Sequence, residues 1–224
     1  GQEADQWCDA VHAPEIPEHV KTMREFTHPE WWINSFKNKE VIHQTGVWPQ
    51  AEVFRRGLQF LEKNRDTDNW FVQIETFDPH EPFDSPDEFR ELYDDQYNGK
   101  YFDWPPYAPV SETKEQVEHI RKRYASLISM CDRNLGKIID FMDRNDMWKD
   151  TMLIVNTDHG FLLGEKDWWA KSVMPCYNEI ANIPFFIWNP KLNVKGERRK
   201  SLAQTIDIPA TILEYFNIDK PRDM

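Results

Sequence analysis

An aspartate and a histidine follow an apolar run, after two intervening polar residues, in the segment TMLIVNTDHG, residues 151 to 160. A carboxylate oxygen and an imidazole nitrogen together suit a divalent cation with mixed oxygen and nitrogen ligands. Adjacent side chains on a regular strand point to opposite faces, so Asp158 and His159 can face one centre only if the chain turns near Gly160. For the triplet alone, the simpler interpretation is that Asp158 caps a turn and His159 packs as a half-buried polar residue.

Two further residues are candidates for contact with an anion. His80 lies in DPHEPF, between two prolines whose fixed φ angles would hold it rigidly, directly after the apolar segment WFVQIETF. Lys171 follows Trp168 and Trp169, where partial desolvation would strengthen its attraction for an anionic group. Taken singly, His80 is most simply a surface loop histidine and Lys171 a solvated charge. Two apolar segments that both end in Asp/His stretches favour a shared site.

Apolar periodicity predicts an α/β layer structure with a mainly parallel sheet flanked by helices. In open sheets of this kind, ligands collect at the carboxyl ends of the strands, where the segments with Asp158 and His80 begin. Residues 1–49 have no sustained period and are interpreted as a loop-rich N-terminal segment, with residues 50–224 forming the α/β part. The predicted elements are helices at 50–65, 111–147 and 203–216 and strands at 70–77, 151–157 and 184–190.

Composition narrows the range of partners. The net charge of −12 argues against nucleic acid or an anionic membrane as the main partner, so an anionic substrate needs local cations. No run of about 18 apolar residues is present that would predict a membrane span. The three cysteines form no CxxC pair, so neither a zinc site nor a disulfide framework is indicated, and the cellular compartment stays open.

The order of four segments resembles the sulfatase family of the alkaline phosphatase superfamily over residues 70 to 219. These segments are FDPHEPF, TMLIVNTDHGFLLGEKDWWAK, IPFFIW and IDIPATILE. The resemblance implies an alkaline-phosphatase-like fold, with Asp158 and His159 as ligands of a divalent cation, most commonly Ca²⁺. It also implies that His80 and Lys171 contact the sulfate or phosphate ester and its leaving oxygen.

Half of the family's site has no counterpart in this chain. The family's early strand with paired aspartates is missing, and so is its C-x-P/A-x-R segment, whose Cys or Ser becomes the formylglycine nucleophile. The cysteine contexts are CDAVH, CDRNL and CYNEI, none of which fits that pattern. The sequence is therefore interpreted as an incomplete, internal part of a longer sulfuric ester hydrolase. Such a part is expected to be inactive alone and able to self-associate through unprotected sheet edges.

Two alternative functions remain open. The first is a phosphodiester or phosphonate monoester hydrolase of the same superfamily, because the same groups bind both kinds of tetrahedral anion. The second is a non-catalytic α/β binding module that has kept the fold and lost the chemistry.

Overall fold

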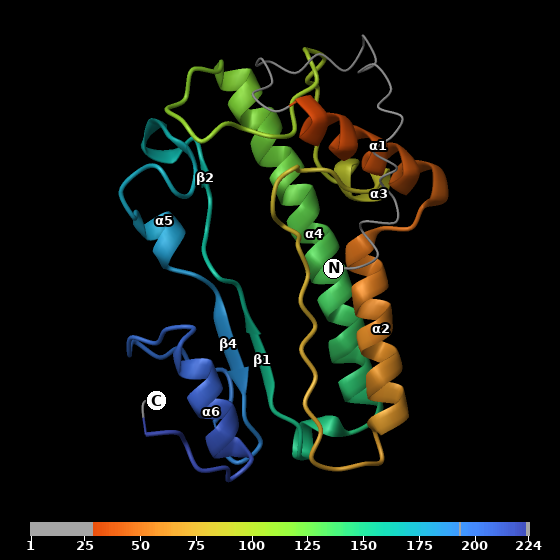
Figure 1. The fold of residues 1–224 in the computed structure, drawn as a ribbon, viewed down its shortest axis with the longest axis vertical. Coiled ribbons are helices and arrows are strands. Elements are labelled where there is room, and N and C mark those ends of the chain that lie inside the picture. Colours follow the sequence, from red (N-terminus) through yellow and green to blue (C-terminus); the bar gives the residue numbers. More distant parts are fainter. Residues whose placement is uncertain (1–28, 193, 223–224) are drawn as a thin grey trace.

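A computed structural model describes residues 29–192 and 194–222 (Figure 1). Two long helices lie along one side, and a narrow pair of strands with a shorter helix lies along the other. The helices are α1 (Pro29–Thr45), α2 (Pro49–Asn64), α3 (Asp87–Arg90), α4 (Lys114–Arg144), α5 (Asn178–Ala181) and α6 (Asp207–Tyr215). The strands are β1 (Leu153–Asn156), β2 (Leu162–Leu163), β3 (Trp169–Ala170) and β4 (Phe185–Trp188).

The long helix α4 is the central element of the fold. It begins with a capping box in which Thr113 accepts from the N–H of Gln116 and Gln116 accepts in turn from that of Thr113. Its apolar stripe contributes to two buried clusters. One lies around Phe83, Ile120, Leu127 and Trp169, and the other joins α4 to α2. The helices predicted over residues 50–65, 111–147 and 203–216 are confirmed, with ends that differ by one to four residues.

The prediction of a mainly parallel sheet is wrong for the described residues. β1 pairs antiparallel with β4, with Leu153 opposite Trp188, and β2 pairs antiparallel with β3. Residues 157–184 connect the C-terminal end of β1 to the start of β4. β4 begins beside that same end of β1, so it must run in the opposite direction. An apolar run indicates burial but carries no information on strand direction, which explains the error. The strand predicted at residues 70–77 is not formed: these residues have no regular secondary structure and belong to no ladder within the described part of the chain.

The predicted loop-rich character of residues 1–49 does not hold for residues 29–45, which form the helix α1. Residues 1–28 lie outside the described part. α1 has no apolar stripe of helical period, so the pattern could not reveal it. Polar contacts fasten it instead, because Lys39 pairs with Asp103 and the His43 imidazole lies 2.7 Å from the Asp84 carboxylate. Across the described ranges, no helix combines the length and apolarity that a membrane span needs.

Candidate functional site

His80 and Lys171 converge on a third residue, Glu81. The Nδ1 atom of His80 lies 2.6 Å from the Glu81 carbonyl oxygen and 3.2 Å from the carboxylate Oε2. The Lys171 Nζ lies 3.9 Å from that same Oε2. The Lys171 side chain is 13% exposed and that of His80 is 30% exposed, so both reach the surface only partly. Two residues separated by ninety positions in the chain therefore share one carboxylate.

Sequence reasoning missed Glu81 and its neighbour Tyr107. The Glu81 side chain is 1% exposed, and its Oε1 accepts a 2.5 Å hydrogen bond from the Tyr107 hydroxyl. Burial, together with this bond to a carboxylate, raises the pKa of Tyr107. One signal could have identified Glu81, because an acid between His80 and the apolar pair Pro82–Phe83 is unusual for a solvated residue. No signal in the sequence points to Tyr107.

The loop that delivers Lys171 is held in an uncommon backbone conformation. The residue before Lys171, Ala170, is fully buried and has a φ of 74°, in the left-handed region that favours glycine. β3 is fastened from its N-terminal side by a hydrogen bond from the Trp169 N–H to the Ala108 carbonyl, at 3.0 Å. The Trp169 indole N–H also donates to Glu112, at 2.7 Å. These bonds fix the position of β3, and the Lys171 side chain extends from there toward Glu81.

Asp158 and His159 lie side by side at the end of β1. The His159 Nε2 is 3.3 Å from Asp158 Oδ2, and the His159 backbone N–H donates to Oδ1 at 2.9 Å. Partial burial works to raise the pKa of Asp158, but the His159 N–H and imidazole outweigh it, so that this pKa lies below its ordinary value. The carboxylate is ionised at neutral pH and 80% exposed. It is available to a cation.

Gly160 is required at this turn because of space rather than a left-handed φ angle. Its N–H donates to the Ile180 carbonyl at 2.8 Å, which draws the two backbones together. A Cβ atom at position 160 would lie 2.0 Å from the Glu179 carbonyl oxygen, so any larger residue must displace the backbone. The chain bends at Asp158 rather than turning at Gly160, and the glycine instead permits the close approach to α5.

The donors at Asp158 and His159 fit part of a metal site. An ionised carboxylate with an imidazole beside it supplies one oxygen and one nitrogen ligand. Within the described residues, no group of three or more His, Cys, Asp or Glu side chains is arranged to hold a metal ion. Ca²⁺ takes six to eight ligands, so these two residues can serve only as part of a larger set.

The three segments that carry the predicted site residues pack into one hydrophobic cluster. Phe83, three residues after His80, packs edge-on against Phe161, with ring centroids 5.4 Å apart. Trp169 and Ala170, just before Lys171, lie in the same cluster. In the described part of the chain, no hydrogen bond, ion pair or ring contact joins the Asp158–His159 pair to the His80–Lys171 pair. The segments are adjacent, and the side chains form two separate pairs.

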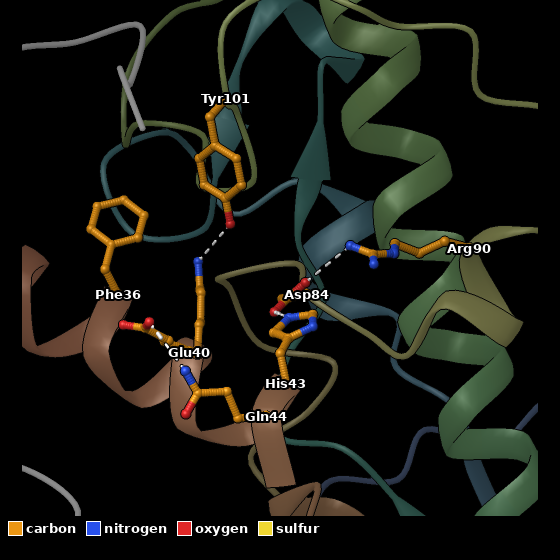
Figure 2. A pocket seen from close by; sticks show the side chains of 8 residues that line it. Phe36, Glu40, His43, Gln44, Asp84, Arg90 and Tyr101 are labelled. Carbon is orange, nitrogen blue, oxygen red and sulfur yellow. Dashed lines mark hydrogen bonds and ion pairs between the residues drawn. The ribbon is translucent and has the colours of Figure 1, made fainter. Parts of the chain in front are cut away.

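A cleft of about 450 Å³ lies beside this region, between α1 and the loops that carry Asp84 and Tyr101 (Figure 2). It contains none of the four predicted site residues. Its cationic groups are paired: the Asp84 carboxylate lies close to both the His43 imidazole and Arg90. Lys39 pairs with Asp103 and donates to Tyr101, whereas the Glu40 carboxylate accepts from the neutral Gln44 amide. Among the described residues, the cleft therefore offers no unpaired cation to an anionic ester.

Comparison with known proteins identifies the family. The sulfatase family model matches residues 17–218. The chain is 22% identical over 205 residues to an arylsulfatase of Clostridium perfringens, an alignment that covers 84% of this chain and 42% of the relative. It is 23% identical to a choline-sulfatase of Rhizobium meliloti, with 84% and 41% covered. The chain thus spans about two fifths of the length of these curated relatives.

A solved structure agrees on the fold. The crystal structure of a protein from Bacteroides fragilis, named as a sulfatase, superimposes with a TM-score of 0.61 at 20% identity. The match covers 75% of this chain and 36% of that one. At this identity the likeness establishes the architecture, which is the α/β, alkaline-phosphatase-like fold, here in an incomplete form. Since the family model spans most of the sequence, the chain belongs to the sulfatase family.

Proposed function

We propose that the protein is a sulfuric ester hydrolase in which this chain supplies His80 and Lys171 to the ester and Asp158 and His159 to a divalent cation, Ca²⁺. The observation that carries the proposal is the convergence of His80 and Lys171 on one buried carboxylate. The formylglycine nucleophile of such an enzyme would lie outside these 224 residues, because no cysteine here has the required context.

Lys171 is suited to hold a sulfate group. Its side chain is only 13% exposed, so water screens its charge less than it screens that of a surface lysine. A fixed cation beside the transferred group stabilises charge that develops on the sulfate oxygens in the transition state. This local charge also explains how a protein with a net charge of −12 can bind an anion.

His80 is suited to act on the leaving oxygen. Its Nδ1 faces two oxygen acceptors of Glu81 and therefore carries a proton, which leaves Nε2 as the nitrogen available to the ester. In the protonated imidazolium, Nε2–H can donate to the departing alcohol oxygen. When bound, the metal would polarise the ester, and Asp158 and His159 would provide one oxygen and one nitrogen ligand.

The test uses the protein expressed from its whole coding sequence together with a formylglycine-generating enzyme. Turnover of 4-nitrophenyl sulfate is expected, and Lys171→Ala and His80→Asn should each lower kcat by about 10²- to 10³-fold. Lys200→Ala, at an exposed position, is the matched control and should leave kcat unchanged. Turnover of an aryl phosphodiester in preference to the sulfate would favour the phosphoesterase alternative. Ester binding without turnover would favour the binding module.

Apolar side chains at the surface support a further proposal of self-association by this chain alone. Phe71, Phe77 and Phe186 are 57%, 68% and 66% exposed and lie on or next to extended segments. Apolar patches beside unpaired extended backbone promote pairing between chains. Light scattering should show a mass that rises with concentration, and Phe71→Ser with Phe186→Ser should reduce it. A monomer at all concentrations would contradict this proposal.

A further inference from the structure

Glu81 lies beside His80 and Lys171, the two residues proposed to bind an anion. A carboxylate is unexpected there, because it repels an anion. The Glu81 side chain is 1% exposed, and a buried carboxylate is costly unless polar groups compensate it. Tyr107 satisfies Oε1, whereas Oε2 is a buried oxygen with no hydrogen-bond partner in the described residues. Two nitrogen-bearing side chains lie within 4.0 Å of Oε2, through His80 Nδ1 at 3.2 Å and Lys171 Nζ at 3.9 Å.

The two contacts at Oε2 have different geometries. The His80 ring is fixed by the shorter contact of Nδ1 with the Glu81 carbonyl and by stacking against Phe77, with centroids 4.2 Å apart. The Lys171 Nζ is at ion-pair distance from Oε2 but beyond hydrogen-bond distance, so the carboxylate attracts the ammonium by charge rather than through a hydrogen bond. The carboxylate oxygen Oε2 therefore faces both a cation and an imidazole, neither of which donates a hydrogen bond to it.

We infer that Glu81 is a positioning residue that tethers the Lys171 ammonium beside His80, so that one cation and one imidazole face the same ester group. This inference rests on the proposed function, because it assigns a role within that site. When the imidazole is protonated, the carboxylate offsets its repulsion of the Lys171 ammonium, and the three groups then carry a net positive charge toward the anion. Glu81 acts through Lys171 and does not itself contact the substrate.

A double-mutant cycle separates this role from simple packing. Glu81→Gln keeps the size of the side chain and an acceptor for Tyr107 but removes the charge. In the whole protein, Glu81→Gln is expected to lower kcat for 4-nitrophenyl sulfate about 10- to 100-fold, as loss of a supporting partner commonly does. In the Lys171→Ala background the same change should lower kcat less than about 3-fold, because the group through which Glu81 acts is gone.

Two matched variants isolate the charge. Tyr107→Phe removes the hydrogen bond at Oε1 and keeps the carboxylate, so its effect on kcat should be smaller than that of Glu81→Gln. Glu88→Gln removes an acid that is 60% exposed and should leave kcat unchanged. Equal, additive losses for Glu81→Gln in both backgrounds, or an unchanged kcat in Glu81→Gln, would overturn the inference.

A second measurement does not depend on activity. In protein labelled with ¹⁵N-lysine, a tethered Lys171 ammonium should give a slowly exchanging signal at low temperature, assigned by its absence in Lys171→Arg. The signal should disappear in Glu81→Gln and persist in Glu88→Gln. Absence of any ester hydrolysis by the wild type would refute the proposed function, and the ammonium signal would then decide the tether alone. A signal that is unchanged in Glu81→Gln overturns it.

Discussion

Phe161 packs its ring edge-on against Phe83, with 5.4 Å between the centroids, and so joins the Asp158–His159 segment to the segment that carries His80. Phe83 is fully buried and Phe161 partly buried in the same cluster. Aromatic pairs of this geometry add to the stability that burial alone provides. The relative placement of the two functional segments therefore depends on a hydrophobic contact rather than on a polar one.

Removal of the Phe161 ring should loosen this connection. Phe161→Ala is expected to lower the free energy of unfolding by about 3 kcal/mol, from lost burial and the cavity that remains. Phe161→Leu should cost less, because it fills most of the volume. Urea denaturation measures both, with Leu202→Ala as a control at a fully exposed position that should change stability by less than about 0.5 kcal/mol. Equal stabilities for Phe161→Ala and wild type would contradict the role of this contact.

The left-handed conformation of Ala170 predicts opposite responses to two substitutions. Ala170→Gly should be close to neutral, within about 1 kcal/mol, because relief of strain offsets the extra entropy of the unfolded chain. Ala170→Val should destabilise by about 3 kcal/mol, since a β-branched residue tolerates a φ of 74° poorly and the site is fully buried. Thermal unfolding of the two variants checks the order. A valine variant as stable as the glycine variant would show that the backbone here is not restrained.

Asp78 predicts a pH dependence of stability. Burial, with a contribution from the nearby Asp84 charge, raises the pKa of Asp78 from its ordinary value of 3.8 to about 6. Between these two pH values the folded protein holds a proton that the unfolded chain has released. Stability from this group is therefore complete below about pH 4 and is lost as the pH rises through 6, by at most about 3 kcal/mol.

Asp78→Asn should remove this dependence. The amide cannot ionise, so the variant should gain stability relative to wild type at pH 7.5 and show little or no gain at pH 4. Urea denaturation at the two pH values provides the comparison, and Asp66→Asn, on the exposed surface, is the matched control. A gain of the same size at both pH values would mean that ionisation of Asp78 is not its source.

Calcium should bind this chain weakly. Asp158 and His159 supply two ligands, and the calcium ion needs at least six oxygen or nitrogen donors to replace its hydration shell. A dissociation constant above about 10⁻⁴ M is expected from titration calorimetry, and Asp158→Asn should weaken binding further. Tight one-to-one binding by these 224 residues would refute the expectation that the remaining ligands come from elsewhere.

Residue types and local spacing were sufficient to predict much of this protein. The step of three and four between apolar residues predicted α4, because a helix that buries one face must repeat with that period. The position of Asp158 and His159 just after an apolar strand predicted that they lie together at its end, and they do. Local rules suffice for such features because each depends on residues a few positions apart.

Only the tertiary structure decided the direction of the strands, the helix at residues 29–45 and the partners of the predicted site residues. Strand direction depends on where a long excursion returns, and α1 is held by charges from loops distant in the sequence. The meeting of His80 and Lys171 at Glu81, with Tyr107 on its other oxygen, joins three separate segments. Such a convergence depends on contacts between residues remote in the chain, and no periodicity or motif encodes their distance in space.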